Sequence, residues 1–99
     1  MAQLGKSSTL LLRAIEGARQ GNEMIFVYEG GREMHDYYDS LCRHLCSMKN
    51  VRCQGGRGTT LDIGAGTLRF VQYRADNPPP SLPHIIIDHR VAEATAAPR

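Results

Sequence analysis

Met24-Ile25-Phe26-Val27-Tyr28 decides the fold, because it is a continuous apolar run rich in β-branched and aromatic residues. Such a run is typical of a strand that is covered on both faces, as in a parallel sheet. Gly30-Gly31 follows at once and interrupts the chain. We therefore expect a buried strand at residues 24–28, with a separate element on either side of it.

Both neighbours of this strand have a helical pattern. Residues 8–20 predict a helix with one apolar stripe, which Ser7 or Ser8 caps and Gly21 ends in a left-handed conformation. The second predicted helix ends near Asn50 and carries apolar residues at 4-3-4-3 spacing, with charged residues largely on its other faces. The residues of this predicted stripe are Met34, Tyr38, Leu41, Leu45 and Met48.

The remainder of the chain has the pattern of short strands. Residues 51–53 predict a short strand, residues 59–63 and 67–73 a hairpin around Gly64-Ala65-Gly66, and residues 84–88 a last buried strand. The proline-rich residues 76–81 predict an exposed loop. The expected fold class is α/β: a small three-layer-like sheet, mostly parallel with one antiparallel hairpin, flanked by two main helices.

Length and composition indicate one small globular domain. The chain has 99 residues, of which 41% are hydrophobic and 22% charged, so we expect a single α/β domain at residues 1–93 and a flexible tail at residues 94–99. A formal charge of +2 does not by itself indicate a nucleic-acid partner. The sequence has neither a membrane-spanning run nor a signal-peptide pattern, which predicts a cytoplasmic protein without a membrane partner.

Two short motifs near the ends of the chain carry a possible chemistry. Gly5-Lys6-Ser7-Ser8 precedes the first predicted helix and matches the second half of a phosphate-binding loop. In that motif, backbone N–H groups and lysine bind phosphate, and the hydroxyl binds Mg²⁺. Ile85-Ile86-Ile87-Asp88 is an aliphatic strand that ends in a carboxylate. The pair, with the order of elements between them, resembles the P-loop NTPases, in particular the ATPase core of phage terminases and helicases.

The resemblance implies a nucleotide site at Gly5, Lys6, Ser7, Ser8 and Asp88, with ATP and Mg²⁺ as its ligands. The chain departs from the family because only four residues precede Gly5, so the first half of the loop and its strand are not found. His89 also stands where many members carry an acid. We therefore expect a degenerate site with no catalytic residues and no bound cofactor. The alternative for these motifs is structural, with Ser7 or Ser8 and Asp88 as helix caps.

Arginines near the predicted hairpin suggest a second kind of site. A basic hairpin beside an aromatic residue is suited to a phosphate backbone, although arginines are also usual on the exposed face of a strand. The candidate nucleic-acid-binding residues are Arg52, Arg57, Arg69 and Arg74.

Cys42, Cys46 and Cys53 form an odd set without a disulfide framework. Cys42 and Cys46 share a helix face, and Cys53 with His35 or His44 could complete a metal site. Free cysteine is often buried in cores, so core packing is the preferred interpretation and no metal site is predicted. A thiol nucleophile is a further alternative that no surrounding motif supports.

The leading functional hypothesis is a non-catalytic interaction protein on a degenerate P-loop-like scaffold. The resemblance suggests that a phage encodes it and that it binds a larger host or viral protein. A missing central strand would leave an unpaired sheet edge, which predicts a homodimer or a tight complex with another protein. The alternatives are a nucleic-acid-binding accessory module and a nucleotide-binding domain or NTPase.

Overall fold

The protein was analysed as a computed structural model, which describes residues 2–58 and 60–91. In this part of the chain, two long helices and five strands follow one another in the order α1, β1, α2, β2, β3, β4 and β5, and a further helical turn begins at His89. The α/β class and the mixed sheet that the sequence predicts are confirmed. The predicted tail at residues 94–99 lies outside the described residues.

The sheet has the strand order β2-β3-β4-β1-β5. The apolar run forms β1 (Glu23–Tyr28), which pairs in parallel with β4 (Gly66–Gln72) on one side and with β5 (Ile85–Ile87) on the other. β3 (Leu61–Ile63) pairs antiparallel with β4 and with the two-residue β2 (Cys53–Gln54). The predicted parallel strand at residues 24–28 is therefore confirmed, although Ile25 on its second face is partly exposed.

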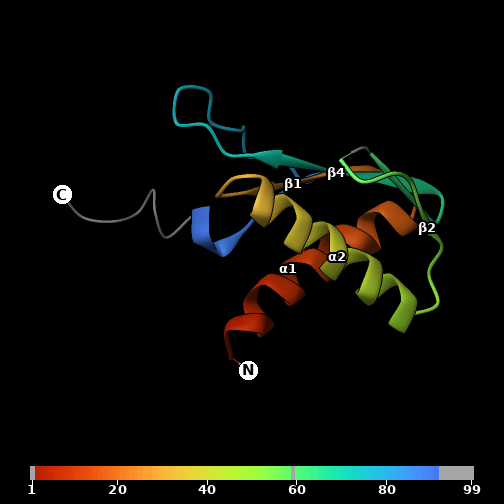
Figure 1. Cartoon of the computed structure of the whole chain (residues 1–99). Coiled ribbons are helices and arrows are strands. Elements are labelled where there is room, and N and C mark those ends of the chain that lie inside the picture. The colour runs from red at the N-terminus through yellow and green to blue at the C-terminus, as the bar shows by residue number, and fades with distance from the viewer. Residues whose placement is uncertain (1, 59, 92–99) are drawn as a thin grey trace.

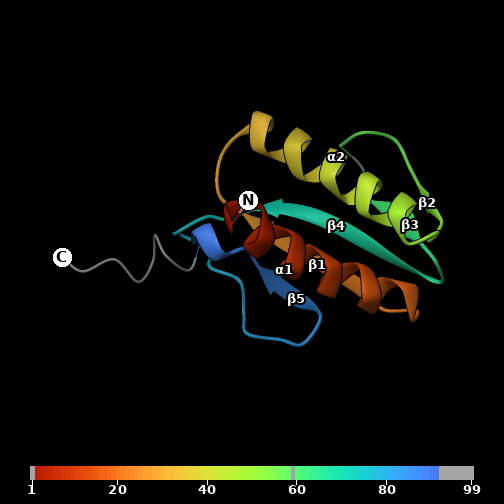
Figure 2. The same cartoon turned by 90° about the horizontal axis from the view of Figure 1, so that it is seen from below.

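Both helices lie on the same face of the sheet. Figure 1 shows α1 (Ala2–Arg19) and α2 (Arg32–Met48) below the strands, and Figure 2 shows α1 over β1 and β5 with α2 beside it over β2, β3 and β4. Alternate residues of β1 point toward this helical layer, and Phe26 is fully buried there against the rings of Tyr38 and Phe70. The core therefore lies between one sheet face and the two helices.

The first helix is longer than the sequence indicates. It begins at Ala2 rather than at residue 8, so Gly5, Lys6 and Ser7 are residues of the helix and not of a loop before it. Alanine, glutamine and leucine at positions 2–4 favour helix, and their propensity outweighs the cost of a single glycine. The predicted caps at Ser7 and Ser8 are therefore wrong.

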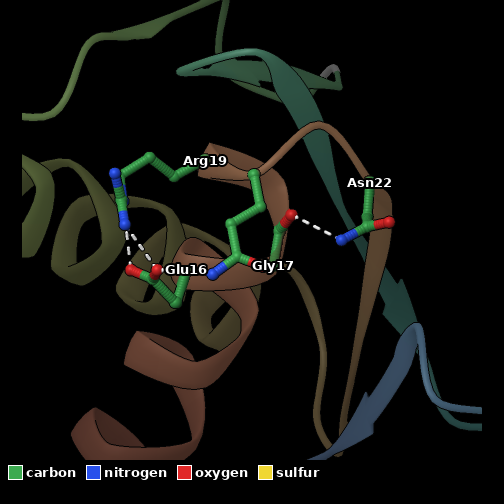
Figure 3. A network of polar contacts seen from close by, with 5 residues as sticks. Glu16, Gly17, Arg19 and Asn22 are labelled. Carbon is green, nitrogen blue, oxygen red and sulfur yellow. Dashed lines mark hydrogen bonds and ion pairs between the residues drawn. The ribbon is translucent and has the colours of Figure 1, made fainter.

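The end of α1 agrees with the prediction. Gly21 has a φ of 108°, which suits glycine, and the Asn22 side chain donates to the Gly17 carbonyl oxygen over 2.9 Å (Figure 3). Gly66, the first residue of β4, lies so close that an added Cβ would approach the carbonyl oxygens of Ala18 and Asn22 to 2.3 Å. This contact fixes where the helix meets the sheet.

The buried face of α2 is rotated from the predicted stripe. Tyr38 and Leu45 are buried as expected, but Met48 is 67% exposed. Cys42, Cys46 and Asp39 take the remaining buried positions. Met48 is the last residue of α2 and so lies where the sheet no longer covers the helix.

The second face of the sheet carries no helix in the described part of the chain. Ile25, Val71 and Ile85 lie on that face and are partly exposed, while Val27 between them is 2% exposed. Residues 77–80 of the predicted proline-rich loop line a hollow of about 230 Å³ with these side chains. The loop therefore covers part of this face. Among the described residues, no helix is long and apolar enough to cross a membrane.

Candidate functional site

Ser7 and Asp88, which the resemblance places at one Mg²⁺ ion, are in direct contact although 81 positions separate them. The Ser7 hydroxyl donates to Oδ1 of Asp88 over 3.1 Å. Ser7 comes from the second turn of α1, and Asp88 directly follows β5. Figure 2 shows the start of α1 beside the segment that leaves β5.

Tyr38 of α2 forms a hydrogen bond with the second oxygen of the Asp88 carboxylate. Its hydroxyl donates to Oδ2 of Asp88 over 2.5 Å, and burial first, then this hydrogen bond, raise the pKa of Tyr38 well above its usual range. Asp88 and Tyr38 are both 0% exposed and Ser7 is 3% exposed. The carboxylate thus joins α1, α2 and β5 in the core, and hydrogen bonds to a charged group contribute about 1.5–3 kcal/mol each.

The remaining residues of the predicted nucleotide site lie outside this buried group. Gly5 and Lys6 are exposed, and Ser8 is partly buried. Lys6 has an interaction of its own within the chain. The helical turn that begins at His89 agrees with the alternative in which Asp88 precedes a helix, but the Asp88 side chain accepts hydrogen bonds from Ser7 and Tyr38.

The four candidate arginines do not form one patch. Arg69 and Arg74 both line the hollow beneath the proline-rich loop, and Arg74 forms an exposed ion pair with Asp76 over 2.9 Å. Arg57 lines a different cleft, and Arg52 donates to the Gln54 side chain on the edge strand β2. The described residues therefore offer two basic positions on the open sheet face and two elsewhere.

The cleft at Arg57 has a volume of about 520 Å³ and lies at the carboxyl ends of β1 and β4. Crevices at this end of parallel strands are common ligand sites in α/β proteins. Arg32, in the first turn of α2, lines it as well, and the sequence reasoning missed this residue. The pKa of Tyr28 in the wall is raised, first by burial and then by the charge of Asp36.

The three cysteines converge at the other end of α2. Their sulfur atoms all lie within 4.8 Å of one another, and Cys42 and Cys46 are fully buried, as the core interpretation predicts. The histidines that the sequence offered as further ligands do not join them: His35 packs against the rings of Tyr28 and Phe70, and His44 is exposed.

Asp39 is the buried group that sequence reasoning missed. It is 0% exposed, and its Oδ1 accepts a hydrogen bond from Nε of Arg43 over 2.6 Å. Its Oδ2 is buried and has no hydrogen-bond partner among the described residues. The i, i+4 spacing of an acid and an arginine was the available signal, but it does not reveal burial.

Comparison of the chain with models of protein families, with curated proteins and with solved structures finds no match.

Proposed function

We propose that this chain is a non-catalytic interaction protein that acts through the free edge of β5 and the strip of open sheet face beside it. The observation that carries the proposal is the composition of this edge: β5 is the last strand of the sheet, and all three of its residues are isoleucine. Natural edge strands usually carry charges, proline or bulges that prevent pairing. This edge carries no charge.

The hydrogen-bond pattern of β5 gives the edge its binding capacity. The Ile25 amide donates to the His84 carbonyl, and the Asp88 amide donates to the Val27 carbonyl. Because alternate residues of a parallel strand bond to opposite neighbours, the backbone groups of Ile85 and Ile87 point away from β1. The Ile85 amide bonds to the Leu82 carbonyl. Within residues 2–58 and 60–91, the Ile87 amide and the carbonyl groups of Ile85 and Ile87 have no other backbone partner, so they can pair with a new strand.

The occupant that this edge fits best is a second copy of the chain. Antiparallel pairing about a two-fold axis at Ile86 places isoleucine opposite isoleucine at every position of the strand, without like charges in contact. β-Branched cross-strand pairs of this kind are favourable, and a two-fold contact closes after two subunits. Glu23 and Arg69, which line one hollow with Ile25, add charges of opposite sign to the face.

The non-catalytic part of the proposal is supported by Asp88. It is the carboxylate to which the resemblance gives a metal-binding role, and both of its oxygens bond to protein hydroxyl groups in the core. The dimer is then the form in which the protein would meet the larger host or viral protein that the resemblance suggests. A phage origin belongs to the same hypothesis.

Light scattering after size exclusion tests the proposal. We expect a mass of twice 11.0 kDa for the wild type and the monomer mass for Ile87→Lys, because a charged side chain then stands opposite Ile85 of the other subunit. Leu82→Lys is the control, since Leu82 is 45% exposed and outside the strand; it should remain a dimer. Hydrogen exchange of the wild type should show a protected Ile87 amide that becomes exchangeable on dilution.

A wild type that stays monomeric at millimolar concentration, or an Ile87 amide that exchanges freely in the dimer, would contradict the β5 contact. Two further results would favour the alternatives instead. A rise in melting temperature with ATP and Mg²⁺ that Lys6→Ala abolishes would indicate nucleotide binding. Salt-dependent binding of DNA or RNA that is lost when Arg57, Arg69 and Arg74 are neutralised would indicate a nucleic-acid module.

A further inference from the structure

The three cysteines of the chain meet where α2 ends and the chain turns back on itself. Lys49 ends the helix, and Asn50 follows with a φ of 57° in the left-handed region. The Val51 amide then bonds to the Cys46 carbonyl over 2.9 Å. This reversal brings β2 back alongside the last turns of α2, so Cys53 lies beside two cysteines that are one helical turn apart.

The sulfur atoms of the three cysteines are slightly farther apart than they would be around a bound metal ion. They lie within 4.8 Å of one another, whereas tetrahedral coordination with Zn–S bonds of about 2.3 Å requires sulfur atoms about 3.8 Å apart. A side-chain rotation of Cys53, which is partly exposed while the other two are buried, is the adjustment with the least cost to the core.

Asp39 supplies an independent observation at the same place. It lies one turn before Cys42 on α2. Its Oδ2 is buried and has no hydrogen-bond partner in the part of the chain that the structure describes, and an unsatisfied buried polar atom carries the full cost of its desolvation. A cation beside Oδ2 would remove this cost.

Arg43 holds the surrounding backbone in place. Its Nε donates to Oδ1 of Asp39 and its Nη2 donates to the carbonyl oxygen of Gly55, over 2.6 and 2.8 Å. One guanidinium thus orients the carboxylate and ties the residue after β2 to α2. Such partners fix the orientation of the ligands in known metal sites.

We propose that Cys42, Cys46 and Cys53 bind one Zn²⁺ ion through their sulfur atoms, with the buried carboxylate of Asp39 as an anionic partner on the same helix. Buried thiolates select a thiophilic cation of this kind over Mg²⁺ or Ca²⁺. The thiols release their protons to solvent as the ion binds, and the metal fixes the two-residue strand β2 to the end of α2. A chain of 99 residues has one modest core, and the free energy of metal binding would add to its stability.

The site is tested on the full chain, purified under a reductant that does not bind metal, by mass spectrometry of its zinc content and by competition with a chromophoric chelator. We expect one Zn²⁺ per chain, and Co²⁺ in its place should give sulfur-to-metal charge-transfer bands. Cys53→Ser should weaken the affinity for Zn²⁺ by more than about 100-fold, because even indirect partners of a metal commonly contribute 10–100-fold.

His44→Ala is the matched control, since His44 is an exposed potential ligand on the same helix, and it should bind Zn²⁺ as the wild type does. Zn²⁺ should raise the melting temperature of the wild type and of His44→Ala but not that of Cys53→Ser, which keeps the test valid if the variant is less stable. A wild type that binds no Zn²⁺, or a Cys53→Ser variant that binds it as tightly as the wild type, would overturn the proposal.

Discussion

Asp88 and Asp39 are both fully buried aspartates, and they differ in how the protein satisfies them. At the α1–α2–β5 contact, Asp88 accepts a hydrogen bond on each oxygen, from Ser7 and from Tyr38. At the α2–β2 contact, Asp39 has one oxygen on Arg43, and the other has no hydrogen-bond partner among the described residues; Asp39 lies on the helix that carries Cys42 and Cys46. A buried carboxylate with complete hydrogen bonding is explained by folding alone, whereas an incomplete one points to a ligand.

The largest effect that we expect is a loss of stability when Asp88 is replaced, which tests its structural role. Asp88→Ala should lower the free energy of unfolding by about 3–5 kcal/mol, because it leaves two buried hydroxyl groups without an acceptor at about 1–3 kcal/mol each and opens a cavity. Urea denaturation monitored by circular dichroism measures the change. Ser7→Ala and Tyr38→Phe should each cost less, about 1–2 kcal/mol.

Asp76→Ala is the control for this series. Asp76 pairs with Arg74 at the surface, where both side chains are 69% exposed, and such pairs contribute little to stability. Its unfolding free energy should stay within about 0.5 kcal/mol of the wild type. If Asp88→Ala behaved like this control, Asp88 would not be the structural link that its hydrogen bonds indicate.

An effect of intermediate size is expected at Asp39. Asp39→Asn should change the stability of the metal-free protein by only about 1 kcal/mol, because the amide oxygen still accepts from Arg43. It should weaken the affinity for Zn²⁺ by about 10–100-fold, as the removal of an anionic partner does at other metal sites. Chelator competition measures the affinity and urea denaturation the stability.

Asp36→Asn provides the comparison on the same helix, because the Asp36 side chain is 40% exposed and pairs with His35 rather than with the cysteines. Asp36→Asn should change neither the stability of the metal-free protein nor the affinity for Zn²⁺. If Asp39→Asn cost as much stability as Asp88→Ala and left the affinity for Zn²⁺ unchanged, the two buried carboxylates would have the same structural role and the contrast between them would disappear.

The sequence predicted the framework of the fold well, and physical reasons explain why. A five-residue apolar run has few alternatives to an inner strand, and glycine pairs at positions 30–31 and 64–66 leave little choice about where elements end. The phase of α2 was harder to predict. A helical stripe defines its direction only to within about one residue, so Leu41 and Met48 appeared equivalent to Cys42 and Cys46 until the neighbouring strands decided which were covered.

The candidate sites depended even more on tertiary contacts. The sequence placed Ser7 and Asp88 in one site through a resemblance, and they do meet, but Tyr38 could not be foreseen because its contact with Asp88 spans 50 positions. The four arginines are close in sequence and still separate, since Arg69 lies on the open sheet face and Arg57 in a cleft at the strand ends. Sequence proximity does not show which side of a sheet a loop takes.

The smallest effect tests the chemistry of the thiol group through pH. The hydrogen bond from Cys42, with a further one from Cys53, lowers the pKa of Cys46 to about 7 against the opposing effect of burial. Burial, with the neighbouring Cys46, raises the pKa of Cys53 to about 11, and the hydrogen bond with Cys46 and burial raise that of Cys42. One thiol of the group is therefore ionised above neutral pH while the other two keep their protons.

Zn²⁺ binding should then release about two protons above pH 7 and about three below it, because the ion must displace the proton of Cys46 only when that thiol is protonated. The affinity for Zn²⁺ therefore falls as the pH falls, by about 100-fold per pH unit above pH 7 and by about 1,000-fold per unit below it. Calorimetry in buffers of different ionisation enthalpy counts the protons. The same number of protons on both sides of pH 7 would show that the three thiols do not share one ionised member.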